Sequence, residues 1–435
     1  MIKRMATTAV LLAVLAAICG AATYEIGPGK TYTNIGDFAW EDLAAGDTVQ
    51  IYYKATPYYE KFGVWAVGTS ANPVTVQGVA GEGGELPIID GNEATTRLDL
   101  DYWGDERCLI KLGGSNIHDN YGVPSYIVIE NLELRNANNS YSYTDDAGTY
   151  KAFTTNATSI WPESGDHIII RNCEIHECGN GLLSSGSSEE ITVEGCHIYD
   201  NSYSLSISEH NIYTETKHIL FQYNLLGEPY GGNNLKDRSA GTIARYNWIE
   251  GGGREFDLVN SYDFSAIYND EQYGDDRIYG NVIIEYNDAT NSQIVHYGGD
   301  MTPTDTYRDG PLKFYNNTVI SQRTGITYLI RNQDDEDADV FNNIVYVPSG
   351  SLYIMATNDG TVDTTYNWFQ SGYTLNGATE PDPTTNLSGS APGFSDYSNG
   401  DYTLTSISDC VDAGMDIPGE LLALFDVDYE YVADH

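Results

Sequence analysis

A short phrase recurs along most of this chain and constrains its fold more than any other feature. Each copy has a β-rich run, a polar turn residue that is usually asparagine, and a second short apolar alternation. Intervals near 23 residues suit a coil of three short strands, and longer intervals suit the same coil with an inserted loop. The sequence therefore predicts an all-β protein, a right-handed parallel β-helix. The turn residues are Asn131, Asn172, Gly195, Asn224, Asn247, Asn281, Asn317, Asn343 and Asn367, separated by 41, 23, 29, 23, 34, 36, 26 and 24 residues.

The asparagines of this repeat have a structural explanation. Their short amide tolerates the left-handed backbone of a tight turn and can hydrogen bond to its neighbour in the next coil. We therefore expect a ladder of stacked asparagines inside one turn of the solenoid rather than a set of catalytic amides.

Further strands are predicted between the asparagine turns. Their alternation directs apolar residues inward and leaves the other residues on one continuous outer face. Such a face is suited to form the floor of a groove for an extended polymer. The predicted strands are Gly181–Ser185, Ser204–Ser208, Asn233–Asp237, Glu255–Val259, Gln293–Tyr297, Ile326–Ile330 and Leu352–Met355.

The two ends of the chain depart from the repeat. Residues 23–125 are expected to form an N-terminal cap, with a short helix around Phe38–Leu43, and the first coils. Residues 126–370 are expected to form the remaining parallel coils, and residues 371–435 a C-terminal coil and cap with a short helix over Pro418–Phe425. Caps are needed because an open solenoid end presents unpaired strand edges.

Residues 1–22 have the pattern of a secretory signal peptide. Lys3 and Arg4 precede the apolar run Ala6–Ile18, and cleavage is expected near Ala22. The protein is therefore expected to be secreted, either to the periplasm or outside the cell. A lipoprotein would use Cys19, but the bulky isoleucine before it fits that signal poorly. No later run approaches the roughly 20 apolar residues of a membrane span.

Charge limits the choice of partner. Aspartate and glutamate number 63 against 21 lysines and arginines, for a formal net charge of −42. Nucleic acid is excluded as a partner because its phosphates would be repelled. A polyanionic polysaccharide would also be repelled at low salt, but a seawater-like ionic strength screens that repulsion. We expect a monomer with a polysaccharide substrate, active in a saline habitat.

Five cysteines remain beyond the signal segment, an odd number without metal-ligand spacing. Cys173 and Cys196 occupy the same place in successive repeats, so stacking of two free thiols inside the solenoid is the main interpretation. A disulfide between them is the alternative, because neighbouring coils bring Cα atoms within bridging range.

Three stretches carry a family resemblance: an N-terminal phrase from Tyr32 to Gly91, a central block Asn234–Asn247, and a C-terminal phrase Gly400–Gly414. They resemble secreted bacterial β-helix polysaccharide lyases, the alginate lyases and chondroitinase B, which share the pectate-lyase-like solenoid. The resemblance implies a lysine base on the floor of the groove and an assisting arginine one coil later.

Transferred to this chain, the family's base position falls on Arg238, with Lys236 two residues before it. The family's arginine position falls on Val259, so Arg254 would have to act from a shifted place. The stretch that holds calcium-binding carboxylates in the family reads Gly231–Asn234 here. Calcium is therefore a candidate cofactor with no ligands assigned, although the acidic run Asp334–Asp339 offers oxygens of the kind calcium prefers.

The densest basic stretch of the chain lies in the same region. Elimination on a uronate needs a neutralised carboxylate, a base within ~3 Å of the C5 proton, and a proton donor for O4. The expected catalytic residues are Lys236, Arg238, Arg254 and His296, and the expected substrate-binding residues are Asn234, Arg245, Asp257 and Tyr297. The alternative is a structural ion-pair set, formed by the basic residues with Asp237, Glu250, Glu255 and Asp257.

The sequence therefore favours a secreted polysaccharide lyase acting by β-elimination on a uronate-containing polymer. His210 is a second candidate proton shuttle. One alternative is a glycoside hydrolase of the same fold, using Asp257, Glu255 or Asp237 as its carboxylate pair. Another is a non-catalytic glycan-binding or surface adhesion protein.

Overall fold

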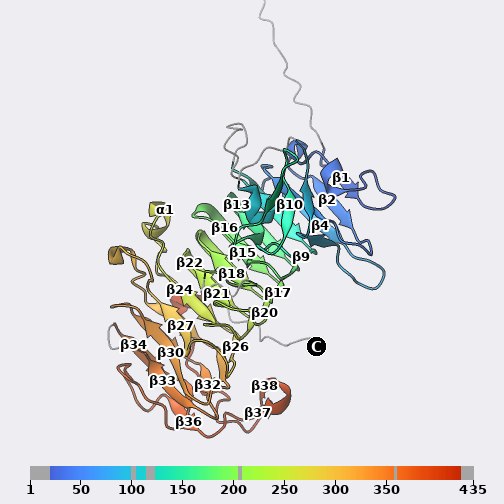
Figure 1. The fold of residues 1–435 in the computed structure, drawn as a ribbon. Coiled ribbons are helices and arrows are strands. Elements are labelled where there is room, and N and C mark those ends of the chain that lie inside the picture. The colour runs from blue at the N-terminus through green and yellow to red at the C-terminus, as the bar shows by residue number, and fades with distance from the viewer. Residues whose placement is uncertain (1–19, 99–103, 114–122, 204–207, 357–359, 423–435) are drawn as a thin grey trace, which may run out of the picture.

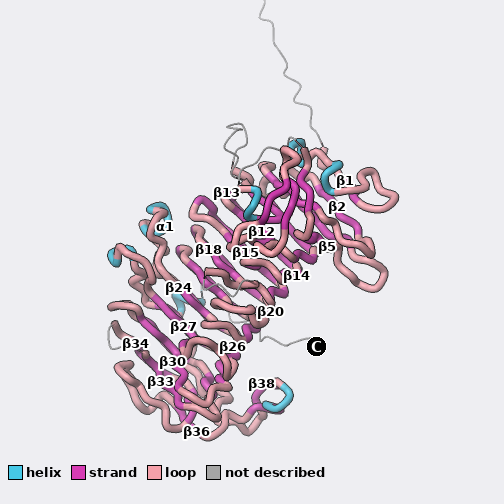
Figure 2. The backbone as a smooth tube through the Cα atoms, viewed as in Figure 1, coloured by secondary structure: helices cyan, strands magenta, loops and turns pink. Residues whose placement is uncertain are grey.

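The computed structural model describes residues 20–98, 104–113, 123–203, 208–356 and 360–422. These residues stack as coils along one axis, from β1 (Thr23–Ile26) at one end to β34 (Val362–Thr365) and β36 (Leu387–Gly389) at the other (Figure 1). Most coils contribute one strand to each of three sheets (Figure 2). Nearly all neighbouring strands pair in parallel, the exceptions being β10 with β11 and β37 with β38. The chain is a parallel β-helix, as the repeat predicted. Most of the expected signal peptide, residues 1–19, lies outside the described residues.

The first sheet has twelve strands and begins each coil. Its strands are β1, β2 (Thr48–Tyr52), β4 (Val74–Val79), β8 (Ser125–Glu130), β13 (Ser164–Arg171), β16 (Ser187–Glu194), β19 (Lys217–Gln222), β22 (Ala240–Arg245), β25 (Arg277–Tyr279), β28 (Leu312–Tyr315), β31 (Ala338–Phe341) and β34.

The second sheet has eleven strands and follows the asparagine turn. Its strands are β5 (Ile88–Asp90), β9 (Glu133–Arg135), β14 (Glu174–His176), β17 (His197–Tyr199), β20 (Leu225–Leu226), β23 (Trp248–Glu250), β26 (Val282–Glu285), β29 (Thr318–Ser321), β32 (Ile344–Tyr346), β35 (Trp368–Gln370) and β36.

The third sheet has thirteen strands and closes each coil, with one antiparallel pair, β10–β11, at its edge. Its strands are β3 (Glu60–Val64), β6 (Ala94–Thr96), β7 (Cys108–Leu112), β10 (Ser142–Thr144), β11 (Tyr150–Ala152), β12 (Thr158–Pro162), β15 (Asn180–Leu183), β18 (Ile212–Thr214), β21 (Leu235–Asp237), β24 (Phe256–Leu258), β27 (Gln293–Tyr297), β30 (Ile326–Asn332) and β33 (Ser351–Met355).

Alternation within each strand builds one continuous core. Ile168 in β13 pairs in register with Ile127 of β8 and with Ile191 of β16, which in turn pairs with Ile219. All four side chains are buried. The β-branched residues therefore stack in columns inside the solenoid, where each covers the apolar surface of the coil before it.

The asparagine turns form the predicted ladder. In each of six steps the backbone N–H of one turn asparagine donates to the Oδ1 atom of the next, and in the same steps its Nδ2 also donates to that Oδ1 atom at 2.9–3.1 Å. The ladder runs through Asn224, Asn247, Asn281, Asn317, Asn343, Asn367 and Asn386. Each amide also donates to a buried carbonyl oxygen in a first-sheet strand of the preceding coil, so the ladder links side chains to the backbone from coil to coil.

Short helices and a returning segment complete the fold. The predicted lead-in helix is present as two 3-10 turns, η1 (Ile35–Asp37) and η2 (Trp40–Asp42), whose Trp40 stacks on Phe62 of β3. Single turns also occur at η3 (Asp105–Arg107), α1 (Ser265–Tyr268), η4 (Thr304–Thr306), η5 (Tyr397–Asn399) and α2 (Gly419–Leu422). Most of the strand predicted over Ser204–Ser208 lies outside the described residues, and the described strand of that coil is β18.

The C-terminal segment runs back along the side of the solenoid. Its antiparallel pair, β37 (Phe394–Asp396) and β38 (Asp401–Leu404), packs Tyr402 against Trp248 of the second sheet. Further on, Met415 exchanges two backbone hydrogen bonds with the side chain of Asn342, both of 2.9 Å. The segment therefore covers apolar side chains on the outside of coils that lie far earlier in the sequence.

All five described cysteines are free. Cys173 and Cys196 are buried in successive coils, as the repeat predicted, and carry no disulfide. Among the described residues, no helix is long and apolar enough to span a membrane.

The ladder leads to a first prediction. Replacing Asn317 with alanine leaves the N–H and amide of Asn281 and a buried carbonyl of β25 without their partner, and each such loss costs about 1–3 kcal/mol. We expect Asn317→Ala to lower the free energy of unfolding by about 3 kcal/mol in urea titrations. The exposed Asn92→Ala is the control and should change it by less than about 0.5 kcal/mol. Equal effects of the two substitutions would contradict the structural role of the ladder.

Candidate functional site

The outer face of the third sheet brings together residues from five successive coils. Tyr213 of β18 lies in register with Lys236 of β21, Lys236 with Asp257 of β24, and Asp257 with His296 of β27. His296 is followed by Arg331 of β30. Because parallel pairing in register places the same face of each strand side by side, these polar side chains form one row along the solenoid axis.

Lys236 lies between two carboxylates. Its Nζ donates to Oδ2 of Asp257 at 2.7 Å and to Oδ2 of Asp300 at 2.6 Å. The two oxygens are therefore no further apart than the sum of these distances. An ammonium held in this way has one N–H left for a ligand, and it acts as a fixed positive charge rather than as a base.

Asp257 organises the site. Its Oδ2 also accepts from Nδ2 of Asn233 at 2.7 Å, and its Oδ1 accepts from His296 Nδ1 at 2.7 Å and from Arg254 Nη1 at 3.4 Å. Burial alone would raise the pKa of this carboxyl, but Lys236, His296 and Arg254 outweigh it and hold the pKa well below its usual range. Asp257 is ionised and its lone pairs are taken, so it positions its neighbours and does not attack a substrate.

His296 is oriented by this carboxylate. Since Asp257 accepts from Nδ1, Nδ1 carries the proton and Nε2 has the lone pair. Nε2 lies 3.0 Å from Oε1 of Gln333, the same oxygen that accepts from Nη2 of Arg331 at 3.1 Å. Nε2 of a neutral ring would accept a proton only after Gln333 moves away from it.

Asp300 completes the cluster from the loop that follows β27. Its two oxygens accept from Nη1 and Nη2 of Arg238 at 2.8 and 3.0 Å, while Arg238 Nε donates to the Tyr213 hydroxyl at 3.0 Å. Burial raises the pKa of Asp300, but Lys236 and Arg238 outweigh it and lower the pKa. We define the charged cluster as Lys236, Arg238, Arg254, Asp257, His296 and Asp300.

The loop that carries Asp300 is fixed to the solenoid by Arg308. This guanidinium is fully buried and donates to Asp237 Oδ2 at 3.0 Å and to Asp276 Oδ1 at 2.7 Å. It also donates to the carbonyl oxygen of Val259. A buried charge with this many partners holds its segment rigidly, so Asp300 is presented from a fixed support.

A neutral histidine stands beside the cluster. His210 accepts the backbone N–H of Asn233 at its Nδ1, at 2.9 Å, so the proton sits on Nε2. Burial, with a contribution from Lys236, lowers the pKa of His210 to about 3. His210 is therefore a neutral hydrogen-bond donor across the physiological pH range.

Two glutamates near the cluster have unusually high pKa values. Burial raises the pKa of Glu215, next to Ser261 and Arg238, to about 7. Burial likewise raises the pKa of Glu336 to about 7, and one of its oxygens lies against the backbone of Gly298. Both can hold or release a proton near neutral pH.

Three of the residues expected to bind substrate do not face this site. Asn234 is fully buried at a turn, where its amide donates to the carbonyl oxygen of Glu250 at 3.0 Å. Tyr297 is fully buried in the core, because strand alternation sends it to the face opposite His296. Arg245 lies in the first sheet and bonds to Gln222. These expectations were wrong.

Two of the carboxylates suggested for a hydrolase, Asp237 and Glu255, also lie away from the outer face. Asp237 is buried inside the solenoid and accepts from Thr214, Ser239, Thr242 and Arg308. Glu255 is buried near Glu285, and neither of its oxygens has a hydrogen-bond partner in the described part of the chain. Neither residue joins Asp257 on the outer face.

Two residues of the acidic run Asp334–Asp339 have other surroundings. Its Glu336 is buried, and its Asp339 forms an ion pair with Lys313. Among the described residues, Asp105, Asp145 and Asp146 form the one group of three close acidic ligands. Lys151 already pairs with Asp145 at 2.8 Å and with Asp105 at 3.5 Å, so a lysine is bound to two of the three carboxylates.

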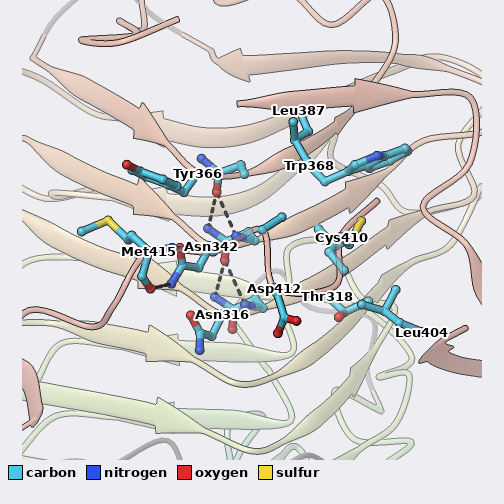
Figure 3. Close-up of a pocket in the computed structure, with 16 residues that line it drawn as sticks. Asn316, Thr318, Asn342, Tyr366, Trp368, Leu387, Leu404, Cys410, Asp412 and Met415 are labelled. Atoms are coloured by element: carbon cyan, nitrogen blue, oxygen red, sulfur yellow. Dashed lines mark hydrogen bonds between the residues drawn. The ribbon is translucent and has the colours of Figure 1, made fainter. Parts of the chain in front are cut away.

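A cavity of about 420 Å³ lies elsewhere, at the corner between the first and second sheets. Figure 3 shows Tyr366 and Met415 on one side of it and Trp368 and Cys410 on the other, with the asparagine ladder between them. Its walls supply amides and a single carboxylate, Asp412. This cavity is the space between the returning C-terminal segment and the coils.

The structure places Lys236, Arg238, Arg254 and His296 in one cluster and adds two neighbours that the sequence analysis did not indicate, Asp300 and Tyr213. Asp300 follows β27 in a long insertion and is 64 residues from its partner Lys236. Tyr213 belongs to β18, a strand that the sequence analysis did not predict. The common register of β18, β21 and β24 is the signal that would have found Tyr213.

No family model and no curated protein matches the chain. Solved structures of similar fold include an alginate lyase from Paenibacillus sp. str. FPU-7, 15% identical over 76% of this chain and 97% of that chain, with a TM-score of 0.47. A GH136 lacto-N-biosidase from Eubacterium ramulus is 10% identical over 84% and 68% of the two chains, with a TM-score of 0.44. Pectate lyase Pel9A is 12% identical over 92% and 88%, with a TM-score of 0.43. Similarity at this level is one of fold and assigns no reaction.

The contacts of Asp257 lead to a second prediction. Asp257→Asn removes a buried charge from between Lys236, Arg254 and His296, and breaking a buried pair of this kind costs about 3–5 kcal/mol. The control is Asp339→Asn, which breaks the more exposed pair with Lys313 and should cost less than about 1 kcal/mol. Urea unfolding measures both. Similar values for the two variants would show that Asp257 does not organise the site.

A third prediction concerns pH. Burial, reinforced by Glu285, raises the pKa of Glu255 well above its ordinary value. The folded protein therefore keeps a proton that the unfolded chain releases, and stability falls as pH rises from the ordinary pKa, near 4.3, towards the folded pKa. We expect Glu255→Gln to have a higher melting temperature than the parent at about pH 8 and the same one at about pH 4. The variant Glu82→Gln changes an exposed residue and is the control, so it should have the melting temperature of the parent at both pH values. If the melting temperature of Glu255→Gln ran parallel to that of the parent over this pH range, Glu255 would not be protonated in the folded protein.

Proposed function

We propose that the protein is a secreted polysaccharide lyase that cleaves a uronate-containing polymer by β-elimination. The observation that carries this is the charged cluster, where three cations meet two ionised carboxylates on the outer face of the third sheet. The cluster is locally positive in a chain whose net charge is −42. A concentrated positive charge in such a chain is suited to bind the carboxylate of a sugar acid.

In this proposal, different residues of the cluster carry out different steps of the reaction. Lys236 and Arg254 are placed to neutralise the substrate carboxylate, which makes the C5 proton acidic. His296, whose tautomer is set by Asp257, takes that proton at Nε2 once the Gln333 amide gives way. The C4–O4 bond then breaks as the C4–C5 double bond forms, and O4 receives a proton. Tyr213 is placed for that last transfer, because Arg238 occupies a lone pair of its oxygen and leaves its O–H to donate.

A glycoside hydrolase is a second candidate function, favoured by one observation. The pKa values of nearby carboxyls are driven apart, since that of Asp300 is lowered while those of Glu215 and Glu336 are raised to about 7. A hydrolase needs such a division between an ionised and a protonated carboxyl. Its product would have no unsaturated sugar end. Glycan binding without cleavage, and calcium as a cofactor, stay predictions of the sequence.

Product chemistry tests the proposal. The mature protein is incubated in moderate salt with polyuronates and with neutral polysaccharides, and ultraviolet absorbance of unsaturated ends is followed beside reducing-end release. We expect both signals to rise together with a polyuronate, and His296→Ala or Lys236→Ala to reduce the rate by about 10²–10⁴-fold. Lys313→Ala, which removes a cation from the first sheet, is the control and should leave the rate unchanged.

The two enzyme classes differ in the outcome of this experiment. A hydrolase would produce reducing ends without new ultraviolet absorbance, and it would lose this activity in Asp300→Asn or Glu336→Gln. That result would contradict the lyase and support the hydrolase. Saturable binding with no new ends of either kind would identify a binding protein.

A further inference from the structure

We propose that His210 is a substrate-binding residue of this site, and that its Nε2–H donates a hydrogen bond to the carboxylate of the uronate. This inference rests on the proposed function and adds to it a third donor for that carboxylate, one that carries no charge. It follows from the position of His210 and from the hydrogen bond that its ring does not make.

The ring of His210 is fixed between two neighbouring coils. Its Nδ1 accepts the backbone N–H of Asn233, from the next coil, at 2.9 Å, and its own backbone N–H donates to Oδ1 of Asn180, from the preceding coil, also at 2.9 Å. Gly232 packs against the ring, since a Cβ atom there would lie 2.9 Å from Nδ1. The ring therefore cannot turn over without losing its bond to Asn233, and Nε2 keeps one orientation.

The other ring nitrogen of His210 carries a proton and has no acceptor. Because Nδ1 accepts, the proton of the neutral ring lies on Nε2. Within the described part of the chain, no oxygen accepts from Nε2. The residue is 2% exposed, but Nε2 is not among the completely covered atoms without a partner, so a ligand oxygen can reach it. Polar groups of buried side chains nearly always have a partner, so a fixed and unused N–H of this kind indicates a ligand.

His210 lies against the charged cluster. Burial is the main cause of its low pKa, and Lys236 is the second. Its ring is perpendicular to that of Tyr213, with 5.5 Å between the ring centres. Its partner Asn233 donates in turn from Nδ2 to Asp257 at 2.7 Å. The ring is therefore next to the groups that receive the substrate carboxylate in the proposed reaction.

Two cations of the cluster have N–H groups left for the same carboxylate. Lys236 uses two of its three N–H groups on Asp257 and Asp300, and Nη2 of Arg254 donates to no described residue. The side chains of Arg254 and Asp300 are 21% and 29% exposed, so the cluster opens to solvent beside them. A carboxylate accepts at about four positions, and a neutral donor fills one of them without adding a charge. This bond strengthens when C5 loses its proton and negative charge moves onto the carboxylate, so His210 should affect kcat more than KM.

Two substitutions separate this role from a structural one. An asparagine side chain places an acceptor near the position of Nδ1 and nothing at Nε2, whereas a glutamine side chain places a donor near Nε2 and nothing at Nδ1. We expect His210→Asn to keep a melting temperature close to that of the parent and to lower kcat with a polyuronate by about 10–100-fold, because a hydrogen bond to a charged group is lost. His210→Gln should have the lower melting temperature of the two and the higher kcat. His167→Asn changes an exposed histidine of the first sheet and is the control, so it should alter neither quantity.

A binding measurement makes the test independent of turnover. His296→Ala protein is labelled with ¹⁵N-histidine and titrated with an oligouronate of four residues. We expect the Nε2 signal of His210, assigned by its absence from the same protein carrying His210→Asn, to shift as the oligouronate saturates the site. This measurement also decides the question if both substitutions of His210 prevent folding.

The remaining outcomes separate this inference from the proposed function. A near-normal kcat in His210→Asn, with a lower kcat in His210→Gln, would assign His210 a structural role and overturn the inference. An Nε2 signal that does not move at saturation overturns it as well, even when the lyase reaction is confirmed. A shifted signal in a protein that makes no unsaturated ends keeps His210 as a carboxylate donor and overturns the lyase. Absence of binding to the oligouronate and to polyuronates overturns both.

Discussion

Hydrogen bonding from each coil to the next is the constraint on which the rest of this structure depends. A single coil cannot pair its own strands, and buried carbonyl oxygens such as those of Ile278 and Phe314 accept from the asparagine of the next coil. Stacking solves both problems at once and fixes the register of every strand. Inserted loops are tolerated only where they project outward between two strands of a coil. The sequence interval between hydrogen-bonded asparagines therefore varies from 19 to 36 residues, while the asparagine turn stays constant.

The inserted loops contribute side chains to the site that the repeated strands do not provide. Asp300 reaches Lys236 from the loop after β27, and that loop is held by the buried Arg308, whose partners Asp237 and Asp276 belong to earlier coils. Buried ion pairs contribute little net stability, since desolvation offsets much of their attraction, but they resist displacement because removing one partner leaves a buried charge. Their value here is positional: the solenoid provides a rigid row of side chains, and Arg308 fixes a loop against that row.

The fold was predictable because its signal is local and repeated, and the row of Lys236, Asp257 and His296 followed from three strands sharing one register. The errors arose where a single position decides the face. Tyr297 adjoins His296 in sequence but points into the core, and Asn234 lies at the corner before β21, where its amide completes the turn. The contact of Asp300 with Lys236 could not be predicted from the sequence, because no periodicity within an insertion indicates which coil the insertion will contact.

The electrostatics of the site are compatible with the anionic substrate that we propose for this acidic chain. Repulsion from the distant carboxylates decays within about 8 Å at physiological ionic strength, whereas the contacts of Lys236 and Arg254 act at hydrogen-bond distance. Burial also keeps Glu215 and Glu336 partly protonated near neutral pH, so they add less negative charge beside the cluster than their number suggests. Near the outer face of β21 and β24 a uronate therefore meets a positive field, because the closest charges are cations and the closest carboxylates are already paired with them.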